Sequence, residues 1–267
     1  MKDNNKAFIF RTLITNSRLK IYGEYISCAI KNGYSILTLK DFYNNYSSNI
    51  KSFVLRHDVD HNGACTRKMF LFEKKIGVKS TYYFRMSTID RELIKEMIDS
   101  GFEVGFHYES LANYADENGI RDPAQVDFNK AREYLVEDIK RFREVTGINK
   151  FSICSHGAPT NDLLKISNNM ILDGIDLEQL GVIFDAYDEK MYDCIDCHIM
   201  DGRLLDNFGF AYKDNPYDAI KKGFSKIVFL THPNHWWISF LRRIRYLLLF
   251  MIGKAKYSTN RSFERTY

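Results

Sequence analysis

The sequence lacks the features that mark exported or multidomain proteins. No positively charged start is followed by a long apolar run, because the apolar stretch 7–10 ends at Arg11, and we therefore expect no secretory signal. The five cysteines are an odd number without a dense framework, which suits a reducing compartment. We expect a cytoplasmic protein. No internal repeat, low-complexity segment or linker is visible.

A strong excess of charge is also absent. The 38 basic and 34 acidic residues leave a formal net charge of +4, which gives no strong case for a nucleic-acid partner. The hydrophobic content of 45% and the charged content of 27% are those of an ordinary globular protein. A chain of 267 residues is long enough for a substantial core, and α/β barrels of this length are often one domain.

Apolar runs and helical stripes alternate along the chain. The run 53–57 predicts a buried parallel strand. Further strands are predicted at 80–85, 102–107, 151–154, 182–186, near 192–198 and at 226–230. Helices are predicted at 20–32, 66–76, 90–100 and 122–146, and from Asn215 onward. About seven strands with intervening helices indicate a single α/β domain, a distorted (β/α)7 barrel. We expect a lead-in over 1–50, the barrel over 51–237, and an amphipathic helix and tail over 238–267.

The first of these strands ends in the pair Asp58-Val59-Asp60. The carboxyl ends of strands are where α/β folds place their chemistry. Neighbouring carboxylates repel each other unless a cation or a proton lies between them. The pair therefore indicates a metal site or an acid/base pair, and an Asp-rich turn is the alternative interpretation.

Three other predicted strands lead into a histidine. His107 ends the strand 102–107, His156 follows the strand 151–154, and His232 follows the strand 226–230. Any one of these could be a structural histidine at a polar loop edge. Titratable groups at the same end of four strands, however, are the way in which a barrel assembles a metal site.

Three motifs resemble those of the polysaccharide deacetylases of carbohydrate esterase family 4, the family of the NodB-homology domain. The motifs stand in the family's order at 58–60, at 101–107 (Gly-Phe-Glu-Val-Gly-Phe-His) and at 230–232 (Leu-Thr-His). The resemblance covers about residues 52–237. It implies that Asp58 is the general base and that His232 is the general acid. It also implies that Asp60 and His107 are metal ligands.

The chain departs from the family pattern at one metal ligand. The family usually has a second histidine four residues after the first, and here that position is Leu111. Another residue must supply the third ligand, and we predict His156. Glu109 and His61 are the alternatives. The ion expected on a mixed Asp/His set is a divalent metal, zinc before cobalt, iron or nickel.

A second departure concerns the base. The family tends to place an arginine beside it, in a motif near residues 152–159, and no arginine stands there. Arg56 or Arg203 could compensate, and the sequence does not decide between them.

Substrate contacts are predicted at Glu109, Arg203 and Trp236. Arg203 follows a predicted strand and offers hydrogen-bond donors to a sugar or a carboxylate. Trp236 or Trp237 could stack on a pyranose ring, with core packing as the alternative.

The resemblance implies a hydrolase that removes an N- or O-acetyl group from a sugar in cell-surface polysaccharide biosynthesis. Its substrate would be a glycan or a nucleotide- or lipid-linked sugar. The alternatives are hydrolysis of a non-sugar amide on the same barrel and an inactive glycan-binding module.

The end of the chain is basic and amphipathic. The segment 238–252 mixes arginines with an apolar run that is far shorter than the about 20 residues needed to span a bilayer. Such a helix either packs on the barrel or lies on an anionic membrane surface. The sequence does not indicate an oligomeric state.

Overall fold

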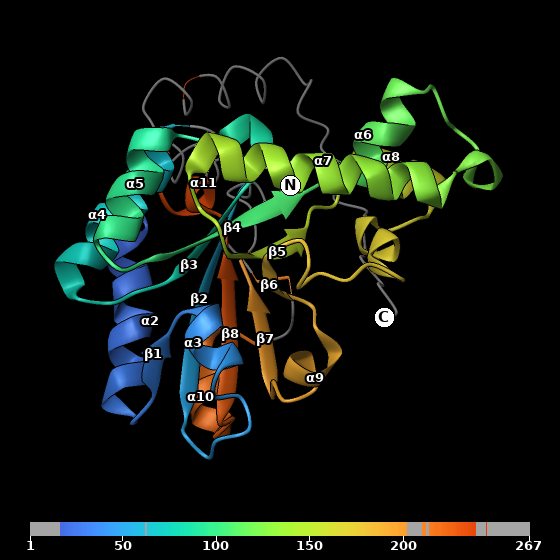
Figure 1. Ribbon diagram of the computed structural model, residues 1–267. Helices are drawn as coiled ribbons and strands as arrows, with labels where there is room; N and C mark the ends of the chain where they lie inside the picture. Colours follow the sequence, from blue (N-terminus) through green and yellow to red (C-terminus); the bar gives the residue numbers. More distant parts are fainter. Residues whose placement is uncertain (1–16, 62, 202–209, 212–213, 239–243, 245–267) are drawn as a thin grey trace, which may run out of the picture.

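The computed structural model describes residues 17–61, 63–201, 210–211, 214–238 and 244. Its eight strands form one parallel sheet in the order β6-β5-β4-β3-β2-β8-β7, and β1 pairs with β2 beside that path (Figure 1). The strands are β1 Ser35–Leu37, β2 Ser52–Val59, β3 Thr81–Phe84, β4 Glu103–Tyr108, β5 Phe151–Ser155, β6 Val182–Asp185, β7 Cys197–Met200 and β8 Lys226–Thr231. The predicted α/β fold of parallel strands is confirmed.

Helices connect the strands. The α-helices are α2 Leu19–Lys31, α3 Leu39–Tyr43, α4 Ala64–Ile76, α5 Arg91–Asp99, α6 Ser110–Glu117, α7 Phe128–Thr146, α8 Pro159–Leu164, α9 Glu189–Tyr192, α10 Pro216–Lys222 and α11 Pro233–Trp236. Three 3₁₀ helices are η1 Met86–Thr88, η2 Pro123–Gln125 and η3 Asn168–Leu172. Each longer helix turns an apolar stripe toward the sheet, as the sequence periodicity predicts. None of the described helices is long and apolar enough to cross a membrane.

The sheet curls into an open barrel. One buried cluster joins inward-facing side chains of β2, β3, β5, β6 and β8, namely Val54, Tyr83, Cys154, Phe184 and Val228. β6, at one end of the sheet, and β8, one strand from the other end, meet in this cluster, so the sheet must be curved. Within the described residues, the end strands β6 and β7 do not pair with each other, and this leaves the barrel open between them.

The pleat of β2 decides which of its residues face the barrel interior. Side chains alternate along a strand, so Arg56 and Asp58 lie on the inner face with Val54. Phe53 and Leu55 face outward and pack with residues of α2. The same alternation places His107 of β4 on the inner face, two residues after Gly105. A Cβ on Gly105 would lie 2.4 Å from the Tyr83 ring, so glycine leaves room for that ring inside the barrel.

A buried hydrogen-bond network lies behind the inner face. The Glu73 carboxylate of α4 accepts hydrogen bonds from Tyr22 Oη (2.5 Å), Ser80 Oγ (2.7 Å) and Tyr82 Oη (2.7 Å) and lies 2.8 Å from His57 Nε2. His57 Nδ1 lies 2.5 Å from Thr231 Oγ1. Burial raises the pKa of Glu73, but His57 and the hydroxyl donors outweigh it, and the pKa lies below its ordinary value. The network therefore fixes β2 against β8 beside Asp58 and His232.

Some predicted elements differ from the structure. The helix predicted over 122–146 is split, because Asp122-Pro123 opens only η2 and Asp127 caps α7 by accepting from two backbone N–H groups. The strand predicted near 192–198 begins only at Cys197, after α9. Strand β1 was not predicted, because three half-exposed residues carry no apolar run. Nearly all of the segment 238–267 lies outside the described residues.

Asp185 at the end of β6 should make the stability of the protein depend on pH. Burial raises its pKa from 3.8 to about 7, although backbone N–H groups of Ala186 and Tyr187 partly oppose the shift, and its Oδ1 has no hydrogen-bond partner. The folded-state pKa of Asp185 is raised, so its protonated side chain contributes to the stability of the folded protein. This contribution is fully present below pH ~4 and is lost as the pH rises through about 7.

We expect Asp185→Asn to be more stable than the parent at pH 8 by roughly 2 kcal/mol or more, since one pKa unit corresponds to about 1.4 kcal/mol. At pH 4 the two proteins should differ much less, because both side chains are then neutral. Thermal unfolding at the two pH values measures this. An equal change in stability at both values would contradict the assigned protonation of Asp185.

Candidate functional site

The carboxylate of Asp60 is the point where the predicted site residues meet. It lies directly after β2, and three imidazoles from the ends of β4, β5 and β8 face it. His107 Nε2 and His156 Nε2 each lie 3.6 Å from Asp60 Oδ1, and His232 Nε2 lies 3.7 Å from Asp60 Oδ2. The structure therefore brings together the three predicted metal ligands and the predicted acid.

These separations fit a shared cation better than hydrogen bonds. A hydrogen bond to a carboxylate is usually shorter than about 3.2 Å, whereas two ligands about 2.1 Å from one tetrahedral ion lie about 3.4 Å apart. Asp60 Oδ1 is buried and has no hydrogen-bond partner, which is unusual for a buried polar atom. Asp60, His107 and His156 offer ligand atoms within 4.8 Å of one another. These residues fit a divalent cation.

Each of the three imidazoles has an acceptor at Nδ1. The acceptors are the Cys154 carbonyl for His107 (3.1 Å), Glu109 Oε2 for His156 (3.0 Å) and Asp201 Oδ1 for His232 (2.7 Å). A neutral imidazole that donates its Nδ1–H keeps a lone pair on Nε2. On all three rings, the atom that faces Asp60 is the one able to bind a cation or to carry a proton toward it.

Burial alone would raise the pKa of Asp60, but the three surrounding histidines hold it well below its usual range. Burial likewise lowers the pKa of His107, and the negative charge of Asp58 more than offsets this. The pocket therefore keeps its carboxylates ionised and ready to bind a cation.

Arg56 holds the predicted base in place. Its Nε donates to Asp58 Oδ1 and its Nη2 to Asp58 Oδ2, both at 2.9 Å. Burial raises the pKa of Asp58, but the guanidinium outweighs burial, and the pKa lies below its ordinary value. The sequence left Arg56 and Arg203 open for this role. The structure places Arg56 there, and Arg203 lies outside the described residues.

Asp201 is a site residue whose role the sequence did not reveal. It follows β7 and is buried. Its Oδ1 accepts from His232 Nδ1 at 2.7 Å, and its Oδ2 accepts from the His232 backbone N–H at 2.8 Å. Burial alone would lower the pKa of His232, but Asp201 raises it to about 9. The available sequence signal was a carboxylate directly after a strand, the same signal that identified Asp58.

The prediction that Trp236 stacks on a sugar ring is wrong in this structure. Trp236 is 1% exposed and lies beneath Arg18, whose Cζ is 4.6 Å from the ring centroid. Its indole N–H donates to Asp201 Oδ2 at 2.7 Å. A ring without an exposed face offers no platform for a sugar, and Trp236 instead helps to hold Asp201.

Glu109 also differs from its predicted role as a substrate contact. Arg85 Nη2 donates to both of its oxygens, at 2.8 and 2.7 Å, and His156 Nδ1 lies 3.0 Å from Oε2. The carboxylate is therefore engaged inside the protein. His61, the other alternative ligand, is exposed and outside the Asp60 group. Leu111 is fully buried in the core on α6, so that position faces away from the site.

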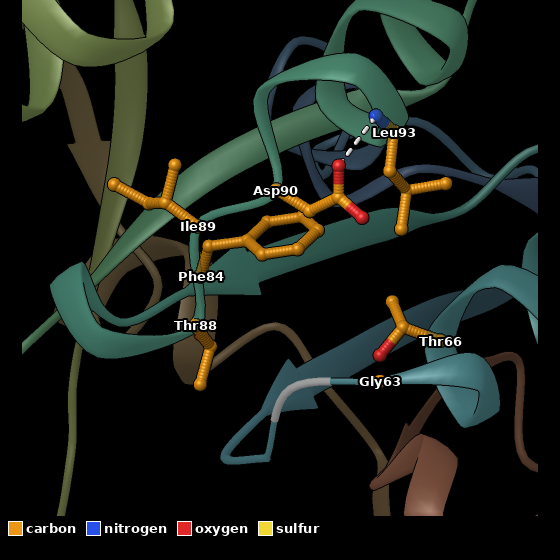
Figure 2. A pocket seen from close by; sticks show the side chains of 7 residues that line it. All are labelled: Gly63, Thr66, Phe84, Thr88, Ile89, Asp90 and Leu93. Carbon is orange, nitrogen blue, oxygen red and sulfur yellow. Dashed lines mark hydrogen bonds between the residues drawn. The ribbon is translucent and has the colours of Figure 1, made fainter.

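A cavity of about 350 Å³ lies beside the loop that follows β2 (Figure 2). Gly63 and Thr66 at the start of α4 line one side, and Thr88 and Asp90 before α5 line the other. The Thr88 hydroxyl donates to the Val59 carbonyl at 2.8 Å, which ties this wall to the strand end that carries the two aspartates. The lining does not include Asp60, His107, His156 or His232, so this cavity is not the candidate metal site itself.

No family model matches the sequence, and no curated protein matches it. Among solved structures, the chain is similar to a family 4 carbohydrate esterase from Bacillus anthracis, with 16% identity and a TM-score of 0.42 over 88% of this chain and 84% of that chain. It is also similar to the catalytic domain of a peptidoglycan N-acetylglucosamine deacetylase from Eubacterium rectale, with 15% identity and a TM-score of 0.41 over 77% and 84% of the two chains. A family 4 pseudoenzyme from Bacillus anthracis matches with 14% identity and a TM-score of 0.40 over 77% and 62%. The first and the third of these structures are named for carbohydrate esterase family 4, the family that the three sequence motifs resemble.

Proposed function

We propose that this protein is a metal-dependent hydrolase that removes an acetyl group from a sugar. The observation that carries the proposal is the buried, unpartnered Oδ1 of Asp60 with two imidazole Nε2 atoms at 3.6 Å. A carboxylate held by an arginine and a histidine held by a second carboxylate stand beside this group. A binding module has no use for such a base and acid, whereas hydrolysis of an unreactive acetyl group needs both.

Asp60, His107 and His156 would hold the ion, and zinc suits one carboxylate and two imidazoles best. Such an ion supplies Lewis-acid polarisation of the acetyl carbonyl and makes water more acidic. The remaining chemistry belongs to the side chains around it.

Asp58 would take the proton from the attacking water. Its Oδ2 lies 3.6 Å from His107 Nε2, so the base stands next to the ligand group. The Arg56 guanidinium keeps Asp58 ionised and fixes the direction of both carboxylate oxygens, which is the positioning that a general base needs.

His232 would give a proton to the leaving nitrogen or oxygen. Its Nδ1–H is held by Asp201, so the proton to be transferred is on Nε2, the atom that faces Asp60. With a pKa of about 9, His232 carries this proton at neutral pH. The base and the acid therefore hold opposite protonation states in one pocket, as hydrolysis requires.

The biological setting is part of the same proposal. The sugar would belong to a cell-surface glycan or to a nucleotide- or lipid-linked precursor, with the acetyl group on nitrogen or oxygen. Cytoplasmic location fits the cysteine usage of the chain, and the basic segment 238–252 would allow contact with an anionic membrane surface. These statements rest on the sequence and its resemblance to family 4 esterases.

Metal analysis tests the ligand set first. We expect near-stoichiometric zinc in the purified parent and loss of metal in each of Asp60→Ala, His107→Ala and His156→Ala, because each removes a ligand. His61→Ala is the control and should retain the metal. Retention in His156→Ala with loss in His61→Ala would move the third ligand to His61.

Asp58→Asn separates an enzyme from a binding module. We expect acetate release from N-acetylated oligosaccharides to fall by about 10²–10⁴-fold, the usual contribution of a general base, while the metal content is unchanged. Asp196→Asn is the matched control, because Asp196 accepts from the Ser225 and Lys226 backbone N–H groups at the opposite end of β8. Unchanged affinity for the oligosaccharide, with no acetate release even by the parent, would indicate an inactive glycan-binding module.

The acid can be tested through its pKa. In Asp201→Asn, we expect the pKa of His232 to fall from about 9, since burial lowers it and Asp201 raises it more than Asp60 or Asp58 does. The acid form exists below the pKa, so the alkaline decline of acetate release should move to lower pH. An NMR titration of the His232 ring in metal-free protein checks the pKa directly. A pKa that does not change would exclude Asp201 as its cause.

A further inference from the structure

We infer that Glu109, held by Arg85, is the positioning residue that makes His156 a metal ligand. The inference rests on the metal site proposed above and assigns a function to two residues outside the ligand set. It also accounts for how this chain manages without a histidine at Leu111.

The register of two neighbouring strands brings Glu109 and His156 together. β4 and β5 are parallel, and their paired residues are His107 with Cys154 and Tyr108 with Ser155. The next residues along the two strands are Glu109 and His156. The His156 backbone N–H donates to the Tyr108 carbonyl at 2.8 Å, so the pairing continues past the end of the sheet. Glu109, two positions after His107, therefore contacts His156, whereas Leu111 already lies in α6.

Arg85 holds the Glu109 carboxylate. Its Nη2 donates to Oε1 at 2.8 Å and to Oε2 at 2.7 Å. The Arg85 Nη1 also points at the Asp60 carbonyl, at 3.4 Å. Arg85 follows β3, so one guanidinium connects the strand ends that carry Asp60 and Glu109. The three side chains of this connection are largely shielded from solvent, with exposed fractions of 23% for Arg85, 15% for Glu109 and 14% for His156.

The carboxylate decides which nitrogen of His156 faces the ion. An ionised carboxylate only accepts hydrogen bonds, so His156 Nδ1 must carry the ring proton in this contact. Nε2 then has a free lone pair and lies 3.6 Å from Asp60 Oδ1. A carboxylate on the far nitrogen of a ligating histidine fixes the ring orientation and makes the ligand more basic.

His107 shows why His156 needs this support. His107 lies within β4, its side chain is 4% exposed, and its Nδ1 faces a backbone carbonyl of the neighbouring strand. His156 lies after its strand and is more exposed, so the sheet does not orient its ring. The side chains of Glu109 and Arg85 fix the orientation of the His156 ring, as a backbone carbonyl does for the His107 ring.

Zinc affinity of the full chain tests the inference. We expect Glu109→Met, which keeps the side-chain length without an acceptor, to bind zinc about 10–100-fold more weakly than the parent in chelator competition, the usual effect of such an outer contact. Glu109→Gln keeps an acceptor oxygen and should lose less. Arg85→Met should also weaken binding. Glu96→Met is the matched control, because it removes a surface carboxylate that lies 2.9 Å from Arg67 and 3.5 Å from Lys74 without touching the site.

A second readout does not need metal. The ¹⁵N shifts of His156 in the metal-free parent should report the proton on Nδ1, and Glu109→Met should lose that single tautomer. The ring signals of His107 should be the same in both proteins, which excludes general misfolding as the cause. Equal zinc affinity of parent and Glu109→Met, or an unchanged His156 tautomer, would overturn the role of Glu109. A parent that binds no zinc would instead overturn the metal site itself, and this inference with it.

Discussion

Two carboxylates at the end of a single strand need positive charge around them, and the arrangement of the site follows from how the fold supplies that charge. Asp58 lies on the inner face of β2, and Asp60 lies two residues later, directly after the strand. Arg56, one pleat earlier, supplies a bidentate partner at 2.9 Å to the first. The second receives three imidazoles at 3.6–3.7 Å. Parallel strands make this possible, because they deliver all of their carboxyl ends to one mouth of the barrel.

The other face of the same strand provides rigidity. His57 lies between Arg56 and Asp58 and points outward, where Glu73 and Thr231 bind its two ring nitrogens. Glu73 itself has four polar partners and no exposed surface. A buried charge with every lone pair engaged resists movement, since any shift leaves a costly unpaired group. The network thus fixes β2 relative to β8, and with it the separation of Asp58 from His232.

The sequence revealed the residues that end strong apolar runs and missed the residues that act through long-range contacts. Asp60, His107, His156 and His232 each follow or end such a run, and the parallel topology then brings them together. The role of Asp201 depends on a contact with His232, 31 residues away, and that of Arg85 on a contact with Glu109, 24 residues away. No local sequence pattern predicts a contact between residues so far apart in the chain. Trp236 was misassigned for a related reason, because burial of a ring is a property of the tertiary structure.

The third ligand shows how the strand register can preserve a site when its residues change position. A histidine at the position of Leu111 would lie on α6, where the structure packs a fully buried side chain. The neighbouring strand β5 instead carries a histidine one residue beyond its last pair with β4, opposite Glu109. The proposed ligand therefore comes from a different strand, yet its Nε2 lies as far from Asp60 Oδ1 as that of His107, 3.6 Å. The family motif does not require a carboxylate at Glu109, but this arrangement does. The His156 ring lies beyond the end of its strand, where the sheet does not orient it, so a side chain must do so.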